Sequence, residues 1–330
     1  MKKIIVTVFL CAMVASTVFA GGRGQADPAR FPTRPVTATV AWPAGTAADM
    51  VFRAIAEVFP NYANGQPFVV DNRPCAAGGV QGVVDFMLNA RPDGYHVFQW
   101  MIAHVIRSHW DNLPFTGTTF EPVAKFMESY NYICVDANSR FQTLQELISY
   151  ARANPGQVTV GNAGPGGGNH MAAIMLERAA GVQFRHVSYP GGPMSINAVM
   201  AGEIDASMNI APEGISNAHG GLIRILGTLS PRRFAEFPHV PTAREAGVDV
   251  IMAQWRGIVV PRGTPPEIVQ RLEDIMRQVV ANPVFVERME SMNAYASFLN
   301  ARDFNALIES ENTRIEAAIR EAGIGNVHGR

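Results

Sequence analysis

The chain has 330 residues, which allows one to three domains and makes two the expected number. Apolar residues make up 48% of the chain and charged residues 17%, so a large core is possible and general disorder is excluded. The formal net charge of −1, without a basic run, excludes nucleic-acid binding, and three cysteines without a C-x-x-C motif exclude zinc modules and disulfide-rich scaffolds.

The first predicted element is a secretory signal peptide at residues 1–20. Lys2 and Lys3 precede an apolar run that is too short to span a bilayer comfortably, and Val18 and Ala20 stand at positions −3 and −1 of a cleavage site. The alternative is a retained membrane anchor. Cleavage removes two lysines and leaves 25 basic against 28 acidic residues, a formal charge of −3. Since no later segment has 18 consecutive apolar residues, we expect a soluble protein in the periplasm or cell envelope.

Strand-like apolar runs then alternate with amphipathic stretches. The predicted strands span residues 36–41, 68–71, 95–100, 158–161, 184–189 and 204–210. The predicted helices span residues 47–59, 79–90, 143–153, 169–180, 265–281 and 301–322. Because helices of this length separate the strands, we expect parallel pairing and an α/β architecture. In the fifth helix, Thr264 is the predicted N-cap, followed by Pro265 at N1 and Glu267 at N3.

The usual catalytic motifs are missing from the sequence. It contains no G-x-S-x-G, S-x-x-K or H-E-x-x-H motif, and its eight histidines are scattered. No Gly-rich loop precedes a Walker lysine, and the nearest dinucleotide-type run, at 164–168, lacks the correct third glycine. We therefore expect no metal, no cofactor and no standard enzyme chemistry.

Two small-residue segments run from the end of a predicted strand into a predicted helix. The first spans residues 41–49 and the second residues 161–170. Small side chains at such a junction expose backbone N–H groups, and the positive end of the helix dipole adds to their attraction for an anion. Each loop is therefore a candidate anion site at the carboxyl end of a strand, where ligands bind in parallel α/β sheets. The alternative is that the glycines close tight turns and that Asp49 and Asn169 only cap helices.

With these loops and several shorter strings in the same order, the sequence resembles the TctC/Bug family of extracytoplasmic solute-binding receptors, which serve tripartite tricarboxylate transporters. The resemblance covers about residues 31–323. The strings include RPV at 34–36, VDNRP at 70–74, RPDGY at 91–95, ANPG at 153–156, VSY at 187–189, AGEID at 201–205, FPHVPT at 237–242 and PRGTP at 261–265.

The resemblance implies a type II periplasmic-binding-protein fold, with two α/β domains hinged around a ligand cleft. One domain is expected to use residues 31–127 and 254–330, and the other residues 128–253. The implied function is a receptor, not an enzyme, that captures a small carboxylate by hinge closure and delivers it to the small and large membrane subunits of a transporter. We expect a monomer. The alternatives are a module that presents its ligand to a sensor protein and an exported enzyme that acts on carboxylates.

The resemblance also implies that both loops grip the ligand carboxylate through backbone amides and bridging waters. The predicted ligand-binding residues are Trp42, Ala44, Gly45, Thr46, Ala47, Ala48, Asp49, Met101, Ala163, Gly164, Gly166, Gly167, Gly168, Asn169, His170, Tyr189 and Asn209. For His170, the alternative is that it only holds its loop.

Several departures from the family pattern bear on the ligand. Asn209 stands where several relatives carry Asp, which removes a possible partner for a ligand amino group. Trp100 and Met101 make the distal pocket more apolar than citrate requires, unless both are core residues. We therefore favour a mono- or dicarboxylate with an apolar or aromatic body. Asp205 is either polar lining or a structural cap, and Arg256 pairs either with a distal carboxylate or in a salt bridge.

Two cysteines remain after signal cleavage. Cys75 and Cys134 would share an oxidising compartment, where a disulfide between them is possible. The alternative is two separate thiols, because Cys134 lies in an apolar run at 132–135 that is typical of a buried strand.

Overall fold

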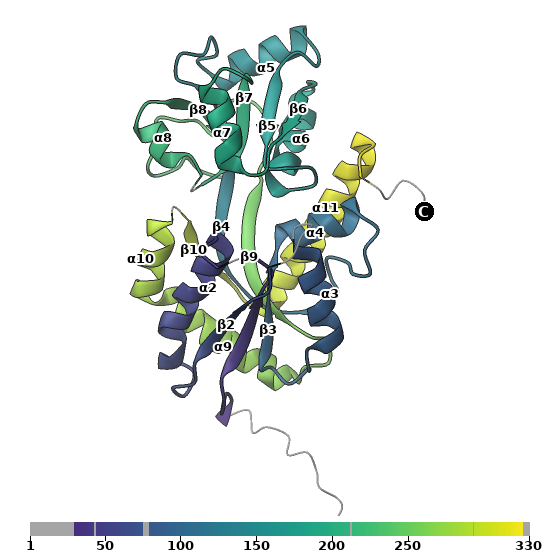
Figure 1. The fold of residues 1–330 in the computed structure, drawn as a ribbon, viewed down its shortest axis with the longest axis vertical. Coiled ribbons are helices and arrows are strands. Elements are labelled where there is room, and N and C mark those ends of the chain that lie inside the picture. The colour runs from purple at the N-terminus through teal and green to yellow at the C-terminus, as the bar shows by residue number, and fades with distance from the viewer. Residues whose placement is uncertain (1–29, 43, 75–78, 212, 293, 326–330) are drawn as a thin grey trace, which may run out of the picture.

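The computed structural model describes residues 30–42, 44–74, 79–211, 213–292 and 294–325, which form two α/β lobes (Figure 1). Lobe 1 is defined by strands β1 (Val36–Val40), β2 (Phe68–Asn72), β3 (His96–Met101) and β10 (Tyr295–Leu299). Lobe 2 is defined by β5 (Thr159–Asn162), β6 (Arg185–Ser188), β7 (Ala206–Ile210) and β8 (Ile223–Thr228). Two longer strands, β4 (Glu121–Asp136) and β9 (Ala253–Val260), run between the lobes.

Each lobe contains a core of parallel strands. In lobe 1, β1 lies between β2 and β3 and pairs in parallel with both. In lobe 2, β5 lies between β6 and β7 and again pairs in parallel with both. Parallel strands need helical crossovers, so helices cover both faces of each sheet, and the central strands are largely buried. Strand β1 illustrates this, because Val36, Ala38 and Val40 are fully buried.

Helices cover both faces of each sheet (Figure 1). On one face of lobe 1 lie α2 (Ala47–Val58), the short 3-10 helix η3 (Phe59–Asn61), α9 (Pro266–Ala281) and α10 (Pro283–Ser291). On its other face lie α3 (Val80–Asn89), α4 (Ile102–Trp110) and α11 (Ala301–Ala322). Lobe 2 has α5 (Leu144–Ala153) and α6 (Gly168–Ala180) on one face and α7 (Gly192–Met200) and α8 (Ile215–His219) on the other.

Strand β4 belongs to both sheets. Its first part pairs antiparallel with β9 and β10 in lobe 1, and its last residues pair antiparallel with β7 and β8 in lobe 2. Strand β9 also pairs antiparallel with β3, so it lies between β4 and the parallel strands of lobe 1. The pairing of β4 therefore joins the two lobes through one continuous strand of 16 residues.

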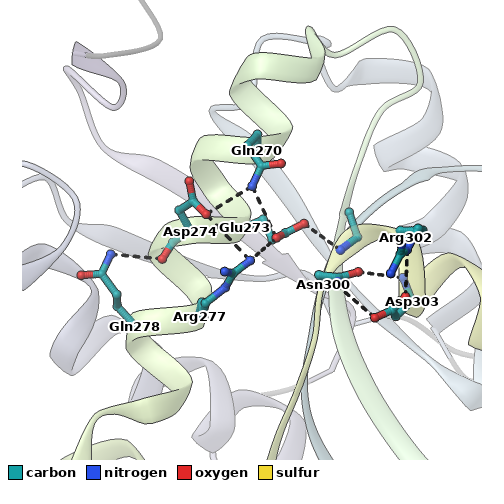
Figure 2. A network of polar contacts seen from close by, with 9 residues as sticks. Gln270, Glu273, Asp274, Arg277, Gln278, Asn300, Arg302 and Asp303 are labelled. Atoms are coloured by element: carbon teal, nitrogen blue, oxygen red, sulfur yellow. Dashed lines mark hydrogen bonds and ion pairs between the residues drawn. The ribbon is translucent and has the colours of Figure 1, made fainter.

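Helix α11 makes a further connection between the lobes. Its base is held in lobe 1, where Glu273 of α9 accepts a hydrogen bond from the Ala301 amide at 2.9 Å, and Asn300 caps the first turn (Figure 2). Its far end lies beside lobe 2, where Arg178 of α6 donates to the Ala318 carbonyl at 3.2 Å and pairs with Glu321. The helix therefore rises from one lobe and rests against the other (Figure 1).

The α/β class and the two-lobed type II periplasmic-binding-protein fold are confirmed, and each predicted helix and strand is present within two residues of its expected ends. The predicted N-cap at Thr264 is wrong. Pro265 is the N-cap of α9, and the Thr264 hydroxyl donates back to the Pro261 carbonyl at 2.7 Å, so it does not cap the helix. The expectation of parallel pairing holds only within β1–β3 and β5–β7, because the strands around β4 pair antiparallel. The exact domain boundaries and the signal peptide at 1–20 stay predictions.

None of the helices in the described part of the chain is both long and apolar enough to cross a membrane.

Candidate functional site

The first predicted loop joins β1 to α2 and is shaped by one acid. Asp49 is 1% exposed, and its Oδ2 accepts hydrogen bonds from the Gly45 amide at 2.7 Å and from Arg53 at 2.8 Å. Thr46 is the N-cap of α2, and its hydroxyl accepts from the Asp49 amide at 3.4 Å. Burial alone would raise the pKa of Asp49, but the hydrogen bonds from Arg53, Gly45 and Asn72 outweigh it and lower the pKa. Asp49 therefore closes the loop as a carboxylate.

The remaining positions of this loop lie around its tip and base. Ala44 and Gly45 are exposed, and Gly45 has a φ of +82°, which favours glycine. Trp42 is half-buried, and its carbonyl accepts from the Asn72 side chain of β2 at 3.1 Å. Ala47 and Ala48 are the first residues of α2, so their amides belong to the N-terminal turn, where N–H groups have no partner within the helix.

The second predicted loop joins β5 to α6 and holds its own shape. The Gly164 amide donates to Asn162 Oδ1 at 3.0 Å, and the Gly167 amide donates to the Gly164 carbonyl at 3.2 Å. Gly164 and Gly166 both have positive φ, at +111° and +67°. Since these amides bond within the loop, the first-turn amides of α6, at Gly168 and Asn169, are the better candidates for an outside anion. Ala163 is half-buried at the base of the loop.

His170 holds this second loop. Its Nδ1 accepts a hydrogen bond from the Gly166 amide at 3.2 Å, and its ring packs edge-on against Trp110 with centroids 5.4 Å apart. Burial, and then the neighbouring His186, lower the pKa of His170 to about 4, so the ring is neutral at neutral pH. The structural role that was the alternative for His170 is therefore present, and a contact with ligand stays a prediction.

Helix α4 contacts both loops. Near its start, His104 packs against Trp42 with ring centroids 5.4 Å apart. Near its end, a Cβ on Gly166 would lie 2.9 Å from the Trp110 ring, and Arg107 donates to the Pro165 carbonyl at 3.5 Å. This helix was not among the predicted elements, although the spacing of its buried residues (Ile102, Val105 and Ile106) is helical.

A buried amide network ties the second loop to the strands between the lobes. Asn131 of β4 is fully buried, donates to Asn169 Oδ1 at 3.1 Å and to the Asn209 carbonyl at 3.1 Å, and accepts from Gln254 of β9 at 2.8 Å. Asn169 in turn donates to Glu213 at 3.2 Å. Sequence reasoning predicted Asn169 and missed Asn131, Gln254 and Glu213, because nothing local marks residues that meet only in the folded chain.

A small, partly open cavity of about 30 Å³ lies where the two lobes meet. Its lining includes Met50 of α2, Ile210 and Ala211 at the end of β7, and Arg256 of β9. Burial lowers the pKa of Arg256 to about 10, and the charge of Glu213 opposes that shift. Arg256 thus lies on a strand between the lobes, as expected, and its Nη1 is 3.8 Å from the sulfur of Met127.

Other singled-out residues lie inside the lobes. Trp100 is 1% exposed and stacks on His104 with centroids 4.7 Å apart, in agreement with the alternative that it belongs to the core. Met101 is buried as well, at the N-cap of α4. The Asn209 side chain is fully buried in lobe 2, where it donates to Ser207 at 2.9 Å.

Two further residues lie at opposite ends of the lobe 2 strands. Tyr189 directly follows β6, and its amide donates to the Asn162 carbonyl at 2.9 Å, so it lies beside the second loop. Asp205 precedes β7, and its carboxylate accepts from the amide and the hydroxyl of Thr159 at 2.9 and 2.7 Å. Asp205 is therefore a structural cap at the amino ends of β5 and β7, away from both loops.

Cys134 is a free and fully buried thiol within lobe 2, with its sulfur 3.6 Å from the Ser207 carbonyl. Its possible partner Cys75 lies outside the described residues. Within the described ranges, no group of three or more His, Cys, Asp or Glu side chains is arranged to hold a metal ion.

Comparisons with known proteins show which family the chain is similar to. A family model described as "Tripartite tricarboxylate transporter family receptor" (TctC) matches residues 51–324. The chain is 30% identical over 318 residues to the UPF0065 protein in the gbd 5′ region of Cupriavidus necator, covering 94% of each chain. It is 24% identical to Protein BugT of Bordetella pertussis over 314 residues, covering 93% of this chain and 95% of that one.

Solved structures give the same result. A TctC solute-binding protein from Polaromonas, without ligand, superposes with a TM-score of 0.79 at 27% identity over 88% of this chain and 99% of the other. R. palustris Rpa4515 with adipate superposes with a TM-score of 0.73 at 26% identity over 89% and 99%. The chain therefore belongs to the TctC/Bug family of extracytoplasmic solute-binding receptors.

Proposed function

We propose that this protein is exported, binds a small carboxylate between its two lobes and delivers it to the membrane subunits of a tripartite transporter. The observation that carries the proposal is the pair of strand-to-helix loops, one in each lobe, that contact opposite ends of α4. Each loop leads into the N-terminus of a helix of 12 or 13 residues, and such helix ends favour negative charge.

The chemistry of the ligand follows from these helix ends. A carboxylate can accept from the first-turn amides of α2 and α6 without needing a positively charged side chain, which fits a mature chain with a net negative charge. The adipate bound to the R. palustris relative supports a carboxylate as the ligand class. The description of the family as a receptor of tripartite tricarboxylate transporters supports a membrane transporter as the partner. We propose that the transporter contributes a small and a large subunit and that the receptor is a monomer outside the cytoplasm.

We propose that the two lobes close around the ligand. Strands β4 and β9 connect the lobes, so a bend in them changes the distance between the two loops. A ligand that touches both loops binds the closed arrangement better than the open one and shifts the equilibrium toward it. No bond is made or broken in this cycle. The predicted domains, 31–127 with 254–330 and 128–253, are the units that we propose move.

A thermal-shift screen tests the proposal. The protein lacking residues 1–20 is heated with a panel of mono- and dicarboxylates, each paired with its uncharged amide as a control, and ligand that co-purifies is identified by mass spectrometry. A carboxylate at about 100 times its Kd should stabilise the fold by about 2.7 kcal/mol. Equal shifts from the amides, or shifts from neutral or cationic solutes alone, would refute a carboxylate receptor.

A further inference from the structure

Glu213 lies at the carboxyl end of β7, in the turn that faces the junction of the lobes. The Glu213 amide donates a hydrogen bond to the Ile210 carbonyl at 2.7 Å, and the hydroxyl of Tyr132 on β4 donates one to the Glu213 carbonyl. The next residue, Gly214, has a φ of +71°. The backbone of this turn is therefore fixed from two sides, and so is the direction in which the Glu213 side chain leaves it.

The carboxylate of Glu213 lies between the starts of two helices. Its Oε2 accepts from Asn169 of α6 at 3.2 Å and from the Ile210 amide at 3.5 Å. At the start of α7, a Cβ added to Gly192 would overlap this same oxygen. Among the described residues, no donor bonds the other oxygen, Oε1. Glu213 therefore has one oxygen engaged and one that can still accept a hydrogen bond.

The residues just before Glu213 in the chain lie at the junction of the two lobes. Ile210 and Ala211 line the small cavity there together with Met50 of α2, which belongs to lobe 1. Burial raises the pKa of Glu213, and the hydrogen bonds from Asn169 and the Ile210 amide, together with the charge of Arg256 on β9, offset that rise only in part. Asn169, which donates to Glu213, is part of the second predicted loop.

A fixed carboxylate changes what this side of the cleft can recognise. The starts of α6 and α7 would otherwise attract an anion, but Glu213 already supplies the negative charge there. A ligand group that approaches from lobe 1 meets an acceptor, so a hydroxyl or ammonium group gains a hydrogen bond to Oε1. A second carboxylate meets like charge in a partly desolvated place.

We propose that Glu213 is a specificity-determining residue, which selects carboxylates that carry a hydroxyl or amino group at the end facing lobe 2 and rejects a second carboxylate there. The proposal rests on the proposed function, because it assumes that a carboxylate binds between the lobes. It names the ligand class more narrowly, as hydroxy- or amino-carboxylates.

The test compares ligands that differ only at the far end. Isothermal titration of the protein lacking residues 1–20 uses butanoate, 4-hydroxybutanoate, 4-aminobutanoate and succinate, and the corresponding five- and six-carbon series. The wild type should bind the hydroxy and amino acids about tenfold or more tightly than the dicarboxylate of equal length. In Glu213→Gln, the dicarboxylate should gain about tenfold and the amino acid should lose about tenfold, since the neutral amide removes both the repulsion and the attraction.

Two further variants serve as controls: one changes the position of the Glu213 carboxylate, and the other changes only the net charge of the protein. Gly192→Ala leaves the carboxylate intact but displaces it, because the new Cβ takes the place of Oε2, and it should also weaken the discrimination. Glu236→Gln removes an exposed glutamate of lobe 2 and should leave the ranking of ligands unchanged. If Glu213→Gln melts like the wild type without ligand, binds carboxylates and keeps the wild-type ranking, the role of Glu213 is refuted while the receptor stands. If no carboxylate binds the wild type in any assay, the proposed function itself is refuted.

Discussion

Asp49 and Glu213 place a carboxylate of the protein's own at a helix start in each lobe. Asp49 accepts from the Gly45 amide in the first loop, and Glu213 accepts from Asn169 at the start of α6. Each acid takes up part of the positive potential that a helix N-terminus provides. A ligand carboxylate must therefore bind to the backbone N–H groups that Asp49 and Glu213 do not occupy. Its binding would depend more on the positions of these groups than on the positive potential of the helix ends.

Residue-level contacts were only partly predictable from the sequence. The loop residues were found because glycine-rich strand-to-helix junctions are local patterns. The network of Asn131, Asn169 and Gln254 was missed because Asn131 is separated from its two partners by 38 and 123 residues. The buried side chain of Asn209 could not be foreseen either, since alternation along β7 does not say which helix covers which face.

The buried histidines predict a specific pH dependence of stability. Burial lowers the pKa of His104 to about 3, and burial with His186 lowers that of His170 to about 4. In the unfolded chain both rings protonate near pH 6.5, so stability is complete above that pH and falls as the pH drops toward 4. Each neutral histidine should contribute a slope of about 1.4 kcal/mol per pH unit in that window.

Urea unfolding between pH 7 and pH 4 measures this slope. Glutamine cannot take up the proton. In His104→Gln, the slope of the free energy of unfolding against pH should therefore be smaller than in the wild type by about 1.4 kcal/mol per pH unit, which corresponds to one proton. The comparison of slopes removes the contribution of the carboxylates, which titrate in both proteins. An unchanged slope would mean that His104 is protonated in the folded protein.

At the scale of elements, α4 positions both loops at once. It starts beside Trp42 and ends beside Gly166 and His170, and its nine residues span about 13 Å. The resemblance left open whether Trp100 and Met101 line the pocket or belong to the core. Both side chains are buried, at the point where the chain turns from β3 into α4. Local contacts accompany this turn, because His104 accepts a hydrogen bond from the Met101 amide at 3.3 Å and its ring packs on Trp100.

The contact between α4 and the second loop predicts the effect of Gly166→Val. The new side chain would press on Trp110 and displace the loop, so we expect the ligand-induced thermal shift to be lost. Gly156→Val is the matched control, because Gly156 has a similar φ of +72° but no neighbouring atom near a new Cβ. Both variants should lose about 1–2 kcal/mol of stability from backbone strain, and only Gly166→Val should lose binding. Normal binding by Gly166→Val would remove the second loop from the site.

At the scale of the whole molecule, the lobes are joined by β4, β9 and α11. Periodicity predicted helices α2, α3, α5, α6, α9 and α11 and the parallel strands, because those patterns repeat over short distances. It did not predict α4, α7, α8 and α10. It could not predict the antiparallel pairing of β4, whose 16 residues serve two sheets and so show no single alternation of buried and exposed positions. The arrangement of the lobes came from the resemblance to a known family rather than from the pattern of apolar residues.

The contacts of α11 with lobe 2 predict how freely the lobes move. Arg178→Ala removes the bond to Ala318 and the ion pair with Glu321, so we expect a broader distribution of distances between the lobes. Spin labels on one exposed site in each lobe would measure this distribution. The loss of stability should be at most about 1 kcal/mol, since the pair is partly exposed. In the control Arg140→Ala, which breaks the pair with Asp205 inside lobe 2, the distribution should stay unchanged. An equal effect of both variants would contradict a role for α11 in lobe movement.

The length of α11 also turns a small rotation into a large displacement. Its 22 residues make a rod of about 33 Å that is fixed at its base by Glu273 of lobe 1. A rotation of roughly 10° about that base would carry the far end by about 6 Å, which is twice the length of a hydrogen bond. If the proposed movement of the lobes has this size, the bonds of Arg178 to this end cannot stretch that far and would have to break. The contact between the far end of α11 and Arg178 would therefore depend on how far apart the two lobes are.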